Sequence, residues 1–197
     1  MTDVLKFGGT SVGTAERIRD VARLVAGRGG DPCVVVVSAM GGITDLLVSL
    51  KSSSSERDRA QAERAREALA QRHVAALAGL GLPAAELTAM SDALASELRR
   101  AEELSAGIFL LEEVSLRTAD ALLCLGEMIS SRLVAAAARA AGADAVWVDP
   151  REILAYEGLE IRRERLDASA HAGARHAAVL AEHRDDVGAT HTQHRAL

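Results

Sequence analysis

The chain has 197 residues, enough for one domain with room for a small subdomain. Hydrophobic residues make up 49% of it but aromatic residues only 2%, so its core must be built from alanine, leucine, valine and isoleucine. A net charge of −5 and a pI near 5.7 argue against a nucleic-acid surface, which needs a basic face. We therefore expect no nucleic-acid partner, and any phosphate site must be local.

The sequence predicts a soluble, cytoplasmic protein. It has no basic-then-apolar leader, and we expect no apolar run of membrane-spanning length and no membrane partner. Cys33 and Cys124 lie in separate apolar segments. Buried free thiols are expected there, which fits a reducing compartment.

The first predicted element is a short strand at residues 4–7, followed by small residues and then by apolar residues at helical spacing over 18–25. Gly8 and Gly9 carry no Cβ, so their backbone can approach a ligand closely. The N–H groups of such a turn, together with a helix start, form an anion site. The alternative is that the glycines merely end a strand. The candidate phosphate-binding residues are Lys6, Gly8, Gly9, Thr10 and Ser11.

A second strand is predicted at Cys33–Val37, because a continuous β-branched run suits a strand buried on both faces of a parallel sheet. Ligands in open α/β sheets bind outside the carboxyl ends of strands, so the loops after both strands face one crevice. The second loop offers hydroxyls and glycine N–H groups there. The alternative is a plain strand-to-helix turn with Thr44 near the helix N-cap. The candidate residues are Ser38, Gly41, Gly42 and Thr44.

The middle of the chain predicts two antiparallel helices over residues 56 to about 105, broken near 79–83 and charged on their outer faces. Serines 52–55 predict a short linker before them, and residues 107–115 a connection back to the sheet. His73 is expected at the surface or between the helices. The apolar residues expected to line the two arms are Leu69, Val74, Leu77, Leu80, Leu87, Met90, Leu94, Leu98 and Leu104.

A long helix is predicted from Thr118 to about Ala141, capped by Thr118 or Ser115. Glycine inside a helix costs ~1 kcal/mol relative to alanine, so Gly126 suggests that something approaches closely. The neighbouring Glu127 is then a candidate binding residue; the alternative is a solvated surface carboxylate.

Beyond this helix we expect a strand over 144–148. We interpret Asp149 at its end as a turn residue before Pro150, and a role in the ligand site is the second interpretation. An exposed charged run is expected at 162–165 and an alanine-rich helix from Asp167 to about Glu182.

Three strings taken together resemble the signatures of aspartate kinases, in the amino acid kinase superfamily: Lys-Phe-Gly-Gly-Thr-Ser at 6–11, Val-Ser-Ala-Met-Gly-Gly-Ile-Thr at 37–44 and Gly-Glu-Met at 126–128. The resemblance covers roughly residues 3–182. It implies an α/β fold, a three-layer sandwich with a mainly parallel sheet and a helical-hairpin insert at about 56–105. Residues 1–185 would form the N-terminal, amino-acid-binding part of the catalytic domain.

The resemblance implies transfer of the γ-phosphoryl group of ATP to L-aspartate, giving 4-phospho-L-aspartate and ADP, the first step of lysine, threonine and methionine biosynthesis. It implies that Lys6 is the catalytic cation and that the ATP phosphates are bound by Lys6, Gly8, Gly9, Thr10 and Ser11. Mg²⁺ should accompany ATP, although its ligands are not identifiable in the sequence, and the family is usually homo-oligomeric. Glu127 would bind the substrate's amino group. The implied substrate-binding residues are Ser38, Gly41, Gly42, Thr44 and Glu127.

The resemblance ends near residue 182, and residues 186–197 are polar and aperiodic. We expect a disordered or aberrant tail and a truncated chain without an adenine pocket, and hence without activity on its own. Three alternatives remain open: a kinase for another amino acid such as N-acetylglutamate, a non-catalytic fragment that pairs with a full-length kinase subunit, and the head of a bifunctional enzyme fused to homoserine dehydrogenase or diaminopimelate decarboxylase.

Overall fold

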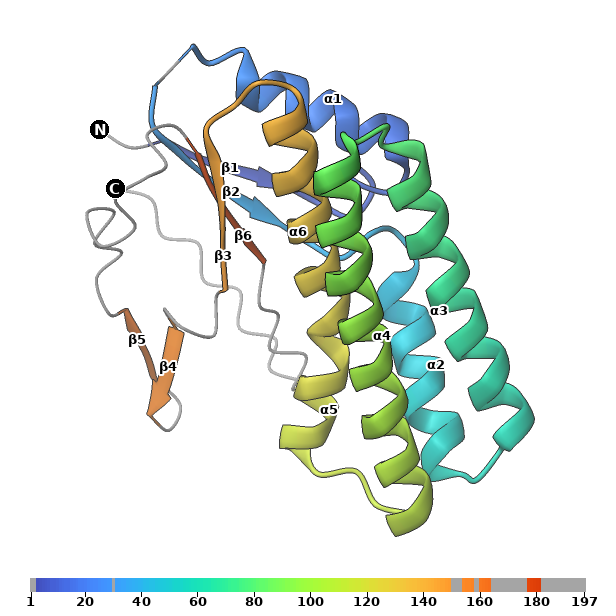
Figure 1. Cartoon of the computed structure of the whole chain (residues 1–197). Helices are drawn as coiled ribbons and strands as arrows, with labels where there is room; N and C mark the ends of the chain where they lie inside the picture. The colour runs from blue at the N-terminus through green and yellow to red at the C-terminus, as the bar shows by residue number, and fades with distance from the viewer. Residues whose placement is uncertain (1–2, 30, 150–153, 158–159, 164–176, 182–197) are drawn as a thin grey trace.

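The computed structural model describes residues 3–29, 31–149, 154–157, 160–163 and 177–181. They form an α/β fold around a parallel sheet with the strand order β1-β2-β6-β3 (Figure 1). Its strands are β1 (Asp3–Phe7), β2 (Cys33–Val37), β3 (Ala145–Val148) and β6 (Ala177–Ala181). A separate antiparallel pair consists of β4 (Leu154–Glu157) and β5 (Glu160–Arg163).

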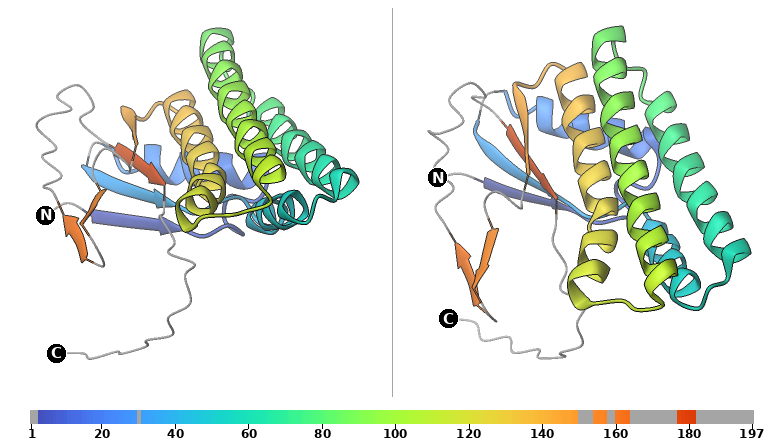
Figure 2. Two further views of the ribbon diagram at one scale, coloured as in Figure 1. Left: turned by 90° about the horizontal axis from the view of Figure 1, so that it is seen from below. Right: turned by 60° about the horizontal axis from the view of Figure 1, so that its bottom comes forward.

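Helix α1 (Ala15–Ala26) connects β1 to β2, and a series of helices connects β2 to β3. Figures 1 and 2 show α3 and α4 as an antiparallel pair, with α4 lying between α3 and α6. The helices of this series are α2 (Ile43–Ser55), α3 (Arg59–Gly79), α4 (Ala84–Leu111), α5 (Leu116–Leu123) and α6 (Leu125–Ala140).

One face of the sheet carries the core. Along β2, Cys33, Val35 and Val37 are buried in the same cluster as α1 and α6, while the residues between them are half-buried. On β1, Val4 is 66% exposed and Lys6 is exposed as well. The prediction that β2 is buried on both faces is confirmed for one face, while on the other Val34 and Val36 are half-buried. The third layer of the predicted sandwich is not among the described residues.

The long helix predicted from Thr118 to Ala141 is present as two segments, α5 and α6, separated by Cys124. Ser115 caps it, as the Thr118 N–H donates to the Ser115 hydroxyl at 3.1 Å. The expectation that no apolar run reaches membrane-spanning length is wrong, since the helical segment Leu116–Ala140 is long and apolar enough to cross a membrane by length and composition. However, 78% of its most apolar window is buried, so this segment is the core helix of the described fold. Of the two free cysteines, Cys33 is buried and Cys124 is half-buried.

Two predicted connections are helical instead. The predicted linker at Ser52–Ser55 is the last turn of α2, where Ser53 donates to the carbonyl of Ser49 at 2.7 Å. Such back-bonding lets serine remain inside a helix. Residues 107–111, predicted as a connection, continue α4 to Leu111.

The predicted alanine-rich helix at 167–182 is wrong where the structure describes it. Ala177–Ala181 is strand β6, paired in parallel with β2 on one side and β3 on the other. Alanine favours helix, but two complete ladders of hydrogen bonds outweigh that local preference. Arg162 and Arg163, predicted in an exposed run, belong to β5. The predicted tail at 186–197 lies outside the described residues.

The predicted helical hairpin is confirmed, including its break, since α3 ends at Gly79 and α4 begins at Ala84. Most of the expected apolar residues face its interior, but Val74 is 53% exposed and Leu87 is 39% exposed. His73 lies in the interior with no exposed surface. Its Nδ1 lies 2.9 Å from the carbonyl of Leu69, and its Nε2 has no hydrogen-bond partner among the described residues. Burial of the ring lowers the pKa of His73 from 6.5 to about 4.

His73 should make the fold sensitive to acid. As the pH falls from 6.5 towards 4, the unfolded chain binds a proton that the folded chain still refuses, so the free energy of unfolding falls over this window by about 2–3 kcal/mol. Urea denaturation at pH 7 and pH 4.5 of the wild type and of His73→Leu measures this contribution. The variant should lose less stability than the wild type, because carboxylate titration is common to both. Equal losses would contradict the assignment.

Candidate functional site

The two predicted site loops lie against each other, backbone to backbone. The Ser38 N–H donates to the carbonyl of Phe7 at 3.1 Å, and the Gly41 N–H donates to the carbonyl of Gly9 at 3.0 Å. These bonds continue the β1–β2 pairing beyond the carboxyl ends of both strands. The structure therefore brings the predicted phosphate loop and the predicted substrate loop together at one edge of the sheet, where α/β proteins bind ligands.

Gly9 is required by this close approach. A Cβ on Gly9 would lie 2.6 Å from the carbonyl oxygen of Ala39 and 3.3 Å from the nitrogen of Gly41, and the first distance is too short for any side chain. Gly8 differs, because a Cβ there would meet no described atom within 4 Å. Gly9 is thus the point where the two loops touch, while the space next to Gly8 is open.

Helix α6 packs onto the second loop at Gly126. A Cβ on Gly126 would lie 2.9 Å from the Cβ of Ala39 and 3.0 Å from Cγ2 of Ile43. One turn later the Ser130 hydroxyl donates to the carbonyl of Ser38 at 2.8 Å. The inference that glycine in this helix marks a close approach is confirmed.

Glu127 is buried, with 7% of its surface exposed, so the alternative of a solvated surface carboxylate is wrong. Residues three apart share a face of a helix, which places Glu127 on the side where Ser130 contacts the second loop. Ser130 is a residue that the sequence reasoning missed, because a serine in an alanine-rich helix carries no distinctive signal. Asp149, at the end of β3, is buried as well.

The first loop is an extended turn before α1. The Ser11 N–H donates to the carbonyl of Gly8 at 2.8 Å, and Thr14 caps α1 by accepting from the Arg17 N–H at 3.4 Å. Thr10 is exposed and Ser11 is half-buried. Lys6, on the sheet face away from the core, is exposed too. The hydroxyl and ammonium donors predicted for a phosphate are therefore accessible from solvent.

The second loop ends in a tight turn that starts α2. The Ile43 N–H donates to the carbonyl of Met40 at 2.9 Å, and Gly42 has left-handed angles with φ 77° and ψ 0°. Thr44 is the second residue of α2 rather than its cap, and it is half-buried. The first N–H groups of a helix have no partner within it, so the start of α2 adds donors beside the glycines.

Arg72 of α3 also belongs to this region and was missed from the sequence. Its Nη2 donates to the carbonyl of Gly41 at 2.6 Å, and its Nη1 lies 2.8 Å from the position of a Cβ on Gly42. Arg72 is one of several exposed arginines on α3, and no spacing in the sequence distinguishes it from the others.

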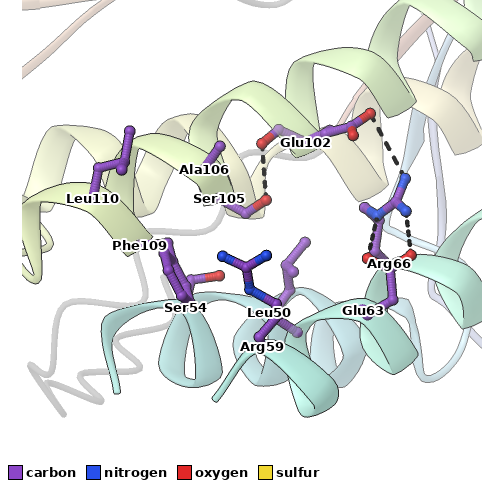
Figure 3. A pocket seen from close by; sticks show the side chains of 11 residues that line it. Leu50, Ser54, Arg59, Glu63, Arg66, Glu102, Ser105, Ala106, Phe109 and Leu110 are labelled. Atoms are coloured by element: carbon purple, nitrogen blue, oxygen red, sulfur yellow. Dashed lines mark hydrogen bonds and ion pairs between the residues drawn. The ribbon is translucent and has the colours of Figure 1, made fainter. Parts of the chain in front are cut away.

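A separate open groove of about 340 Å³ lies between α2, α3 and α4 (Figure 3). At one end Arg66 pairs with Glu63 and lies 3.6 Å from Glu102, while Arg59 lies over the ring of Phe109 at 5.2 Å. None of the predicted site residues lines this groove. The glycine loops, rather than this groove, form the candidate site.

Comparison with known proteins agrees with this geometry. The model of the amino acid kinase family matches residues 1–181. The chain belongs to the amino acid kinase family. Aspartokinase 1, chloroplastic, from Arabidopsis thaliana is 34% identical over 156 residues, which are 78% of this chain and 26% of that protein. The bifunctional aspartokinase/homoserine dehydrogenase 1 of the same plant is 32% identical over 151 residues, 77% of this chain and 16% of that protein.

Solved structures of aspartokinases share the fold. E. coli aspartokinase III in complex with aspartate and ADP has a TM-score of 0.75 at 21% identity, over 91% of this chain and 40% of that one. The aspartate kinase from Synechocystis has a TM-score of 0.54 at 27% identity, over 92% of this chain and 22% of that one. The resemblance to aspartate kinases inferred from the sequence is confirmed. The chain spans about a quarter or less of the curated relatives described above, and the roles of single residues remain predictions.

The tight contact at Gly126 yields a stability test. We expect Gly126→Ala to lower the free energy of unfolding by about 1 kcal/mol, because overpacking costs ~1–3 kcal/mol and exceeds the ~1 kcal/mol gained in helix propensity. Gly107→Ala in α4 is the matched control, since a Cβ there meets no described atom within 4 Å. That change should stabilise the protein. Urea denaturation measures both, and stabilisation by both would show that α6 is not closely packed at Gly126.

Proposed function

We propose that this chain carries the aspartate- and phosphate-binding part of an aspartate kinase, the enzyme that converts ATP and L-aspartate to ADP and 4-phospho-L-aspartate. The observation that carries the proposal is the contact of Gly9 with the second loop at the carboxyl edge of β1 and β2, where α6 packs on the same loop beside the buried Glu127. Aspartokinase relatives, one of them solved with aspartate and ADP, support it. The reaction is phosphoryl transfer, in which positioning and charge stabilisation dominate.

The first loop suits the transferring phosphoryl group. It offers the accessible Lys6 ammonium, the hydroxyls of Thr10 and Ser11, and the peptide N–H groups around Gly8. All of these donate hydrogen bonds, and donors held in place stabilise the negative charge that spreads over the equatorial oxygens. Lys6 neutralises that charge, and the amides of Gly8 and Gly9 hold its oxygens.

The second loop and α6 suit the amino acid. The Glu127 carboxylate accepts hydrogen bonds from the α-ammonium group of aspartate, and the low exposure of the carboxylate strengthens this ion pair. Ser38 and Thr44 orient the substrate's carboxylates, with Gly41 and Gly42 lending backbone N–H groups. One site thus combines donors for phosphate and carboxylate with one acceptor for an ammonium group, which matches the charges of the two substrates.

Mg²⁺ accompanies ATP in phosphoryl transfer, and when bound it neutralises the phosphate oxygens. No group of three carboxylate, histidine or cysteine side chains gathers among the described residues. Because Mg²⁺ is commonly held by one or two carboxylates together with the substrate's phosphates, we assign it no ligand among them. We assign no step to the metal in this chain.

Glu127 should select for the substrate's amino group. Succinate resembles aspartate without that group, so the wild type should bind aspartate more tightly than succinate. Glu127→Gln keeps the side-chain shape but removes its charge, and it should weaken aspartate binding by about tenfold or more while leaving succinate binding nearly unchanged. Glu103→Gln, on the exposed face of α4, is the control. Calorimetric titration of the three proteins with aspartate and with succinate measures these affinities, and a parallel loss for both ligands in Glu127→Gln would reject the role given to Glu127.

Lys6 should govern phosphate binding, and the chain alone should not turn over. We expect inorganic phosphate to bind in the millimolar range and Lys6→Ala to abolish that binding, with Lys51→Ala unaffected. Hydroxylamine trapping with Mg-ATP and aspartate should give no aspartyl hydroxamate, because nothing among the described residues is assigned to adenine. Lys6-dependent turnover would show that the chain is self-sufficient. Absence of phosphate binding would favour the second candidate, a non-catalytic fragment.

A further inference from the structure

The turn at Met40–Ile43 has a specific geometry. Its closing bond, from the Ile43 N–H to the carbonyl of Met40, spans four residues, and Gly42 in its third position has φ 77° and ψ 0°. Gly41, in the second position, is not among the glycines with positive φ. A positive φ at the third position alone defines a type II turn, whereas a type I turn has a negative φ there and a type I′ turn has a positive φ at both positions. The two types differ by rotation of the central peptide, here the one between Gly41 and Gly42.

Two successive glycines allow that peptide to rotate, because neither carries a Cβ that would favour one orientation. Arg72 makes the contact that distinguishes the two orientations. Its guanidinium donates to the Gly41 carbonyl, the oxygen of the central peptide. Rotation to a type I turn would carry this oxygen away from α3 and break the hydrogen bond.

We propose that Arg72 is a positioning residue that holds the second loop in its binding orientation. In a trans peptide the carbonyl and the following N–H point in opposite directions. With the Gly41 oxygen held towards α3, the Gly42 N–H points away from α3 and is available to an anionic group of the substrate. The inference deepens the proposed function and rests on it for the identity of the ligand.

The helix that carries Arg72 is itself fixed to the first loop's helix. A Cβ on Gly79 would lie 2.6 Å from the Cβ of Ala15, so α3 ends in close contact with the start of α1. Arg19 of α1 donates to the carbonyl of Gly79 as well. Arg72 therefore extends from a helix that is anchored relative to both loops.

Other arginines on α3 do not make such a contact. Arg64 donates only to Gln61 in its own helix, at 2.8 Å, although it is as exposed as Arg72. Arg64→Ala is thus a matched control for removing an exposed charge from this helix. Arg72→Lys keeps the charge and one donor, so it should partly restore what Arg72→Ala removes.

The first measurement is the turn itself, in the ¹⁵N-labelled full chain without ligand. A type II turn brings the Hα of Gly41 close to the Gly42 N–H, which gives a strong nuclear Overhauser effect. This signal should be strong in the wild type and in Arg64→Ala, and weak in Arg72→Ala. Gly42→Ala, which disfavours positive φ, should weaken it as well. An unchanged signal in Arg72→Ala would overturn the proposal.

The second measurement is titration with L-aspartate and with inorganic phosphate. Arg72→Ala should weaken the binding of at least one ligand by about tenfold or more at an unchanged melting temperature, and Arg72→Lys should recover part of the loss. Wild-type affinity in Arg72→Ala would overturn the proposal. If the wild type binds neither ligand, the proposed function fails, and the turn measurement alone then decides whether Arg72 orients the loop.

Discussion

The site depends on backbone-to-backbone contact between segments that are far apart in the sequence. Gly9 lies against the backbone of Ala39 and Gly41, and Gly126 of α6 lies against the side chain of Ala39. A side chain at Gly9 would collide with the loop backbone and separate the two loops, while one at Gly126 would press against the side chains of Ala39 and Ile43. Farther along α6, the buried alanines at 135–138 leave room for close packing by the second half of the helix as well. The fold around the site is organised to keep this contact.

The helical hairpin α3–α4 supports the site from outside. Contacts in the C-terminal half of α3, at Gly79 and Arg72, link it to α1 and to the second loop, so the two loops share one external support. The partly exposed ion pair of Arg66 with Glu63, at one end of the groove, contributes little to stability by comparison. The buried seam of apolar residues between α2, α3 and α4 carries the packing energy. A helix held by its core can present a single arginine at a defined place.

Much of the site could be predicted from the sequence because its signals are local. Adjacent glycines after a strand, or a glycine inside a helix, predict a close approach of the backbone to another segment from a few residues of sequence alone. The structure shows such a close approach at Gly9, Gly41 and Gly126. Strand β6 could not be predicted, because its alanines favour helix locally and only pairing with β2 and β3 makes them a strand. Arg72 and Ser130 were missed for the same reason: each acts through a partner many residues away, on a backbone carbonyl that no sequence pattern identifies.

The electrostatics of the chain constrain how such a site can work. The net charge is −5, so the long-range electrostatic field of the protein does not attract anions. At physiological ionic strength, salt also screens this field beyond ~10 Å. Attraction must come from donors in direct contact with the ligand: peptide N–H groups, hydroxyls and the Lys6 ammonium. Such donors are effective only when their directions are fixed, because a mobile glycine loop would lose conformational entropy on binding. The glycines that permit close approach are also the residues most free to move, and this conflict is resolved by contacts from Ser130 and Arg72 on loop carbonyls. Glycine provides the space at this edge of the sheet, and side chains from α3 and α6 provide the rigidity.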